Sequence, residues 1–221
     1  VVAAARRADR LDALASRHAG RVHPLLLDVR DRAAVEASLA TLPAAWSEVE
    51  VLVNNAGLAL GLEPAQRASV DEWQTMIDTN CTGLVVVTRA LLPGMVERGR
   101  GHVVNVASVA GTYPYPGGNV YGATKAFVRQ FTLNLKADLI GTGVRATSVE
   151  PGMVETEFSL VRFSGDAGKA KQVYQGMQPL GPEDVADAIL WAVSRPAHVN
   201  VNALELMPER QAFSPFAVKR G

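Results

Sequence analysis

The chain has 221 residues, of which 48% are hydrophobic, and its 22 basic and 22 acidic side chains give a formal net charge of zero. This length and apolar content suit one well-buried domain, and balanced charge without a basic block argues against nucleic acid or an anionic membrane surface as a partner. The single cysteine, Cys81, excludes an internal disulfide and suits a reducing cytoplasm, and no apolar run approaches the roughly 18 residues of a membrane span.

Strand-like and helix-like segments alternate along the chain, which is typical of parallel strands joined by crossover helices. Apolar runs predict the strands, while helical periodicity and the capping residues Asp31 and Ser69 predict helices. In chain order we expect a strand at 1–5, a helix ending near 20, a strand at 22–27, a helix after 31, a strand at 49–53, a helix at 69–97, a strand at 102–107, a helix ending near 141, a strand at 144–149, a helix from 182 or 183 to about 194, and a strand at about 202–207. The predicted fold is an α/β, doubly wound parallel sheet in a single domain over 1–221, with an irregular tail at 208–221.

The segment from Tyr121 to Lys125, with Ser108 upstream, carries the clearest chemical signal. Residues four apart share a helix face, so the Lys125 ammonium is expected beside the Tyr121 phenol, where it would lower a pKa that is ordinarily about 10. Ser108 ends an apolar strand, which is where open α/β sheets bind ligands. Together the three side chains predict a carbonyl-reducing site, although each alone could be an ordinary surface or strand-end residue.

This Ser, Tyr-x-x-x-Lys arrangement resembles the short-chain dehydrogenase/reductase family, which has a Rossmann-type fold. The resemblance implies that Tyr121 passes the proton, Lys125 lowers its pKa and holds the nicotinamide ribose, and Ser108 polarises the carbonyl. Asn80 matches the family's helical asparagine, whose backbone carbonyl holds a water in the proton relay. An ordinary interior helix asparagine is the alternative for Asn80.

Two further segments match family motifs, and their order along the chain strengthens the resemblance beyond any single motif. The run 54–57 matches NNAG, which could otherwise be a turn signal, and the run 151–156 matches PGxxxT, whose threonine hydrogen-bonds the nicotinamide carboxamide. Besides Tyr121 and Lys125, the cofactor contacts that these motifs imply come from Asn55, Ala56, Gly57, Pro151, Gly152, Val154 and Thr156.

The start of the chain departs from the family pattern. The segment that begins at Val1 matches the family's second strand. We therefore expect the first strand and its glycine-rich turn, TGxxxGxG, which cradles the pyrophosphate, to be missing from an N-terminally truncated chain. Two apolar strand edges would then be unpaired.

Arg6 and Arg7 directly follow the strand at which this architecture chooses between the two nicotinamide dinucleotides. Guanidinium groups suit the 2′-phosphate of NADP through charge-assisted bonds, whereas an acid would favour NAD. We therefore expect NADP as the cofactor, with a solvated helix start as the alternative for the arginines. Asp28 and Val29 resemble the family's adenine-binding pair, although Asp28 could instead approach a helix cap.

A closer resemblance over residues 1 to about 207 is to the bacterial NADP-dependent 3-hydroxy acid dehydrogenases of the family. It implies serine, L-allo-threonine and 3-hydroxypropionate or malonic semialdehyde as substrates. It also implies a homotetramer whose main interface packs the helices around 82–97 and 122–139. The runs that carry this resemblance are 52–61, 117–131, 161–166 and 196–200.

A 3-hydroxy acid carries a carboxylate, which needs a cation or several donors when it is buried. Arg162 is the candidate for this role, and a surface or subunit-interface arginine is the alternative. Tyr115 and Tyr113 are expected to line the substrate pocket, with core packing as the alternative. The four histidines show no metal-ligand spacing, so we expect no catalytic metal.

Two other functions remain open from the sequence. A keto reductase acting on another substrate class would need the same catalytic residues. A non-catalytic dinucleotide sensor would share the fold, because a fold alone does not determine a function.

Overall fold

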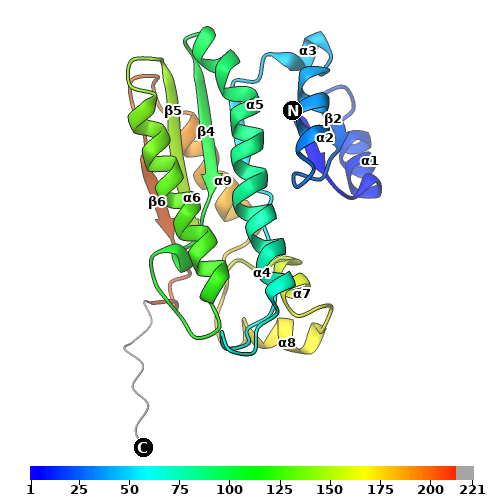
Figure 1. Cartoon of the computed structure of the whole chain (residues 1–221), viewed down its shortest axis with the longest axis vertical. Coiled ribbons are helices and arrows are strands. Elements are labelled where there is room, and N and C mark those ends of the chain that lie inside the picture. Colours follow the sequence, from blue (N-terminus) through cyan, green and yellow to red (C-terminus); the bar gives the residue numbers. More distant parts are fainter. Residues whose placement is uncertain (213–221) are drawn as a thin grey trace, which may run out of the picture.

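A computed structural model of the chain describes residues 1–212 and has strands and helices in the predicted order (Figure 1). The expected tail at 208–221 is irregular as far as residue 212, and its remainder lies outside the described residues. The elements are β1 (Val2–Ala5), α1 (Ala8–Arg17), β2 (His23–Leu26), α2 (Arg32–Ala40), α3 (Ala44–Ser47), β3 (Val51–Asn54), α4 (Val70–Ile77), η1 (Asp78–Gly83), α5 (Leu84–Glu97), β4 (Gly101–Val106), η2 (Val109–Gly111), α6 (Asn119–Asp138), β5 (Val144–Pro151), α7 (Phe158–Arg162), α8 (Ala167–Gln172), α9 (Pro182–Val193) and β6 (Ala203–Leu206).

The strands are all parallel, which confirms the α/β class, but they form two sheets where a single sheet was predicted. β1 pairs with β2, while β3, β4, β5 and β6 lie side by side in that order. β3 is therefore an edge strand, and its Val51 and Val53 are 44% and 40% exposed. Strands of parallel sheets are ordinarily covered on both faces and paired on both sides, so the single sheet is interrupted next to β3.

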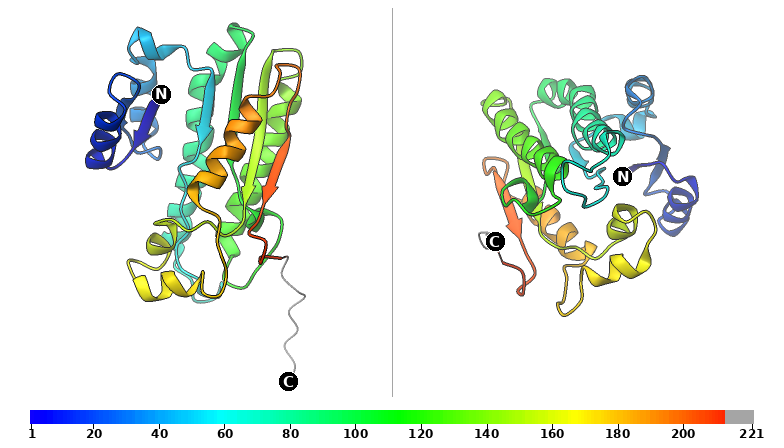
Figure 2. Two further views of the ribbon diagram at one scale, coloured as in Figure 1. Left: turned by 180° about the vertical axis from the view of Figure 1, so that it is seen from behind. Right: turned by 60° about the horizontal axis from the view of Figure 1, so that its bottom comes forward.

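Helices cover both faces of the four-stranded sheet. α5 and α6 lie on one face and α9 on the other, as the two opposite views show (Figures 1 and 2). The main core between the sheet and α5 and α6 contains the buried side chains of Met95, Val103, Leu135 and Val144. β4 is covered on both faces and is rich in valine, whereas β5 alternates apolar side chains with buried polar ones such as Thr147 and Ser148.

The helices α4, η1 and α5 form one continuous segment, Val70–Glu97. By length and composition alone its 28 residues could cross a membrane, with a mean hydropathy of 1.2 over the most apolar window. The sequence was expected to contain no such segment. Its α5 part packs against β3, β4 and α2, which is the place of a core helix in a layered α/β domain.

Both predicted helix caps are present. The Asp31 carboxylate accepts the N–H of Ala34 at 2.9 Å, and the Ser69 hydroxyl accepts the N–H of Glu72 at 3.3 Å. The helix that begins after Ser69 is not uniform, however, because η1 is a π-helical turn. Such turns are rare inside α-helices and occur frequently at functional sites. This one carries Asn80.

The segment between β5 and α9 forms two short helices, α7 and α8, that the sequence did not predict. They lie at the end of the molecule towards which the strand arrows point (Figures 1 and 2). In open α/β sheets this is the end that binds ligands.

Candidate active site

Ser108, Tyr121 and Lys125 converge at the carboxyl ends of β4 and β5. Their residues are 8%, 9% and 6% exposed, so all three are buried. The Ser108 hydroxyl donates to the carbonyl oxygen of Pro151 at 3.3 Å and also hydrogen-bonds the phenol of Tyr121. The structure thus brings together the three residues that the sequence placed in one site.

The electrostatics of the pair Tyr121 and Lys125 differ from the prediction. The Lys125 ammonium donates to the carbonyl oxygen of Val106 at 2.8 Å and lies 5.9 Å from the centroid of the Tyr121 ring. Burial raises the pKa of Tyr121 to about 12, against the opposing effects of the Ser108 hydrogen bond and the Arg162 charge. Burial also lowers the pKa of Lys125 to about 8. The expected lowering of the tyrosine pKa by Lys125 is therefore wrong, because desolvation of the phenolate is the largest effect on this pKa.

Asn80 ties three parts of the site together through its side chain. Its carboxamide accepts the N–H of Leu58 at 2.9 Å and donates to the carbonyl of Leu58 at 2.9 Å and to the hydroxyl of Thr124 at 3.0 Å. A Cβ on Gly57 would lie 3.3 Å from the Asn80 side-chain oxygen and 3.4 Å from the Lys125 nitrogen. Sequence reasoning assigned Asn80 only a backbone role, and this side-chain role was missed.

The asparagine that opens the NNAG motif is held by a buried polar network. Asn54 donates to the Asn105 side chain at 2.8 Å and to the Thr88 hydroxyl at 2.9 Å. This network joins the end of β3 to β4 and α5. The next two residues, Asn55 and Ala56, are exposed at the carboxyl end of the strand, where a ligand can reach them.

Two glycines let η2 approach α6 closely. A Cβ on Gly111 would lie 2.7 Å from the carbonyl carbon of Lys125, and a Cβ on Gly122 would lie 2.9 Å from the carbonyl oxygen of Ala110. Only glycine fits where two backbones meet in this way. The contact holds the turn after Ser108 against the helix that carries Tyr121, and the glycine next to Tyr121 was the sequence signal for it.

Arg162 lies over Tyr121. Its guanidinium donates to the hydroxyl of Tyr115 and its central carbon is 5.4 Å from the centroid of the Tyr121 ring. The backbone carbonyl of Arg162 accepts the N–H of Gly61 at 3.1 Å, which anchors α7 to the loop after NNAG. The predicted substrate residues Arg162 and Tyr115 therefore lie at the site. Tyr113 hydrogen-bonds the carboxylate of Glu205 on β6 at 3.2 Å instead.

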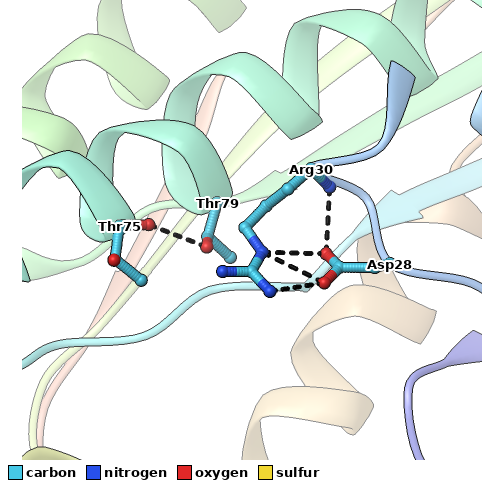
Figure 3. A network of polar contacts seen from close by, with 4 residues as sticks. All are labelled: Asp28, Arg30, Thr75 and Thr79. Carbon is cyan, nitrogen blue, oxygen red and sulfur yellow. Dashed lines mark hydrogen bonds and ion pairs between the residues drawn. The ribbon is translucent and has the colours of Figure 1, made fainter. Parts of the chain in front are cut away.

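The residues expected to bind the adenine half of a dinucleotide are already engaged with protein groups. Asp28 accepts from the Arg30 guanidinium at 2.6 and 3.0 Å beside the helix that carries Thr75 and Thr79 (Figure 3). This contact holds the pKa of the Asp28 carboxyl below its ordinary value. Val29 packs against Gly83, where a Cβ would lie 2.7 Å from a Val29 methyl group.

The two arginines that follow β1 differ in their contacts. The Arg7 guanidinium pairs with Glu157 at 2.8 Å. Arg6 is exposed, and its charge helps to lower the pKa of Asp28. Their roles towards a phosphate stay predictions.

The PGxxxT segment is held by residues that the sequence did not single out. Gly152 donates to the carbonyl of Leu206 at 2.8 Å, and the carbonyl of Val154 accepts the Tyr174 hydroxyl at 2.8 Å. Thr156 accepts the N–H of Phe158 at 3.1 Å. The Gln211 side chain accepts the N–H of Met153 at 2.8 Å. Among residues 1–212, no group of three or more His, Cys, Asp or Glu side chains is placed to hold a metal ion.

The chain resembles known proteins over its whole length. Residues 1–165 match the family model for short chain dehydrogenases. The chain is 58% identical over 221 residues to the NADP-dependent 3-hydroxy acid dehydrogenase YdfG of Escherichia coli strain K12, covering all of this chain and 89% of that protein. It is 50% identical over 220 residues to serine 3-dehydrogenase of Agrobacterium fabrum, covering 88% of that protein.

The solved structures give the same result. The closed form of serine dehydrogenase complexed with NADP+ superposes with a TM-score of 0.99 at 58% identity, covering 100% of this chain and 90% of that one. The family model spans well over half of the chain, and the matched residues include Ser108, Tyr121 and Lys125. The chain belongs to the short-chain dehydrogenase family.

Proposed function

We propose that the protein is an NADP-dependent dehydrogenase that transfers hydride reversibly between the nicotinamide and C3 of small 3-hydroxy acids. The observation that carries the substrate class is the position of Arg162 over Tyr121, because it sets a cation beside the proton-transferring phenol. Relatives at 58% and 50% identity are named as 3-hydroxy acid and serine dehydrogenases, which supports the same choice.

The residues present fit a nicotinamide dinucleotide. A side chain on Gly57 would place its Cβ 3.4 Å from the Lys125 nitrogen, so glycine leaves room there for a ribose to approach the ammonium. Lys125 has three donors, one of which points to Val106. Arg6 and Arg7 are exposed cations that suit a 2′-phosphate. Lys125 would hold the ribose, and the backbone of 55–57 and 151–156 would line the cofactor.

NADP, when bound, supplies or accepts the hydride. Tyr121 exchanges the proton on the substrate oxygen, and the Ser108 hydroxyl donates to the oxyanion that develops there. The Lys125 ammonium favours the phenolate that Tyr121 becomes when it gives up its proton, and it would hold the ribose. Asn80 keeps the NNAG loop and α6 in register through Leu58 and Thr124.

Arg162 fixes the substrate by its carboxylate in this proposal. A guanidinium binds a carboxylate through two parallel charge-assisted bonds, which places C3 relative to Tyr121. Tyr115 holds the guanidinium from the side through its hydroxyl. Serine, L-allo-threonine and 3-hydroxypropionate all present a carboxylate and a 3-hydroxyl group, with malonic semialdehyde as the substrate in the reverse direction.

The test follows NADPH absorbance during incubation of the protein and NADP+ with L-serine, L-allo-threonine and 3-hydroxypropionate. Turnover of these acids that is lost in Tyr121→Phe supports the proposal. If the protein binds NADPH and reduces ketones without a carboxylate but leaves the hydroxy acids and malonic semialdehyde unchanged, it is a keto reductase of another substrate class. NADPH binding without any turnover would instead indicate a sensor.

We also propose a cytoplasmic homotetramer assembled through α5 and α6. The exposed side chains of Val96 and Phe127 supply apolar surface on these helices, and Phe127 stacks on Phe131 with ring centroids 6.0 Å apart. A free cysteine and NADP-linked chemistry suit the reducing cytoplasm. Light scattering during size-exclusion chromatography measures the mass, and a monomer would refute the assembly.

A further inference from the structure

We propose that Glu157 is a positioning residue that ties the segment covering the active site to the arginines at the cofactor phosphate position. Here the covering segment means residues 154–162. The inference rests on the proposed NADP dependence, since the 2′-phosphate of NADP would be a second anionic partner for Arg7 beside Glu157. It assigns Glu157 two effects: it holds the covering segment closed, and it competes with the 2′-phosphate for Arg7.

The contact is one carboxylate shared by two guanidinium groups, one from the residue before α1 and one from α1 itself. One oxygen of Glu157 lies 2.8 Å from Arg7, and the other lies 2.9 Å from Arg10. Both arginines lower the pKa of the carboxyl, with the Arg7 hydrogen bond as the largest effect. Glu157 therefore links the start of α1 to a segment about 150 residues further along the chain.

Glu157 immediately precedes α7, so its position controls the residues that cover Tyr121. The ring of Phe158 lies 5.8 Å from the Tyr121 ring. Arg162, at the other end of α7, is held by Tyr115 and Gly61. The covering segment is thus anchored at its far end by Tyr115 and the loop that contains Gly61, and at its near end by Glu157. Loss of the near anchor would free Phe158 and the preceding cofactor-motif residue Thr156.

Because Glu157 pairs with two arginines, a phosphate can replace its carboxylate at Arg7 while Arg10 still holds the covering segment. Arg7 is the second residue after β1, at the place where a 2′-phosphate is expected, while Arg10 lies about one helical turn further on. A phosphate at Arg7 would be repelled by the neighbouring carboxylate and would take over that guanidinium. Arg10 would retain Glu157. The side chains of Arg7, Arg10 and Glu157 are 61%, 60% and 49% exposed, so each effect should be only about two- to fivefold.

The experiment compares the wild-type protein with Glu157→Gln, which keeps the size of the side chain and removes its charge. Glu36→Gln is the matched control, because it removes another exposed carboxylate that pairs with an arginine at 2.8 Å, away from the site. Hydrogen exchange of peptides from residues 154–162 is measured without cofactor. Dissociation constants for NADPH and for NADH are measured by fluorescence titration.

For Glu157→Gln we expect exchange in the covering segment to be about two- to fivefold faster, and the preference for NADPH over NADH to rise by a similar factor. Arg10→Gln should speed exchange in the same way but leave the NADPH preference unchanged. Exchange at the wild-type rate in Glu157→Gln would overturn the positioning role, and an unchanged NADPH preference would overturn the competition. Failure of the wild-type protein to bind NADPH would refute the proposed function itself, whereas the cofactor-free exchange still decides the positioning role.

Discussion

The ammonium of Lys125 donates to the carbonyl oxygen of Val106 at 2.8 Å. This contact directs a buried cation towards the last residue of β4 and away from the phenol. Burial then favours the neutral form of both Lys125 and Tyr121, whose pKa values become about 8 and about 12. At neutral pH, Tyr121 starts as the protonated phenol, which is the form that donates a proton to a carbonyl oxygen during reduction.

Replacement of Tyr121 by phenylalanine should abolish turnover while the fold persists. The ring and its packing remain, but the proton donor is lost, so the rate should fall by at least about 100-fold. NADPH binding, measured by fluorescence, should change little. Tyr113→Phe removes a phenol hydroxyl that donates to the Glu205 carboxylate, and it should keep wild-type turnover. Similar losses in both variants would contradict the assigned role of Tyr121.

The depressed pKa of Lys125 predicts a pH dependence of stability. The group has a pKa of about 8 in the folded protein against an ordinary 10.5, so between these values the unfolded chain binds more protons than the folded one. Below pH 8, Lys125 is charged in both states, and its burial therefore lowers the free energy of unfolding. As pH rises from 8 towards 10.5 the folded protein loses this charge first, so the free energy of unfolding should increase.

Denaturant unfolding of cofactor-free wild type and Lys125→Met between pH 8 and 9 measures this contribution. That window lies below the ordinary pKa values of 9.0 for Cys81 and 10.0 for Tyr121, whose raised pKa values act in the opposite direction at higher pH. The difference in unfolding free energy between the two proteins should shift in favour of wild type as pH rises. A constant difference would show that Lys125 is not desolvated.

The contact between η2 and α6 predicts that Gly111→Ala disrupts the site. Its Cβ would lie 2.7 Å from backbone atoms of Lys125, so η2 or α6 must move, and Ser108 must separate from Tyr121. Overpacking of this kind typically costs about 1–3 kcal/mol. Gly94→Ala is the control, because its Cβ meets the end of the flexible Arg98 side chain at 3.0 Å. The unfolding temperature and the turnover rate should fall in Gly111→Ala and stay near the wild-type values in Gly94→Ala. Equal decreases in both variants would contradict the close approach of η2 and α6.

Much of the fold was predictable because its signals are local. The Asp31 and Ser69 caps, the apolar run of β4 and the four-residue spacing of Tyr121 and Lys125 each fix geometry over a few residues. These elements bring the catalytic side chains to one end of the sheet.

The remainder depends on contacts between distant segments. At the π turn, the Asn80 carboxamide hydrogen-bonds both the N–H and the carbonyl of Leu58. Helical periodicity in the sequence does not reveal this contact. The pKa of Tyr121 depends on burial under α7, and that helix was not predicted. Gln211 reaches Met153 across 58 residues of sequence, so no local pattern reveals it.

The position of Arg162 predicts substrate selectivity. Arg162→Met keeps an apolar stem of similar length but removes the charge, and a hydrogen bond to a charged group is worth about 1.5–3 kcal/mol. The KM for L-serine and 3-hydroxypropionate should therefore rise about 10- to 150-fold. For a small secondary alcohol without a carboxylate, KM should stay constant or fall, because the variant no longer holds a partly buried cation without an anionic partner. Arg67→Met is the control, since Arg67 is an exposed arginine paired with Glu63 at 3.2 Å. An equal loss of activity towards acids and neutral alcohols would show that Arg162 supports the fold of α7 and does not bind the carboxylate.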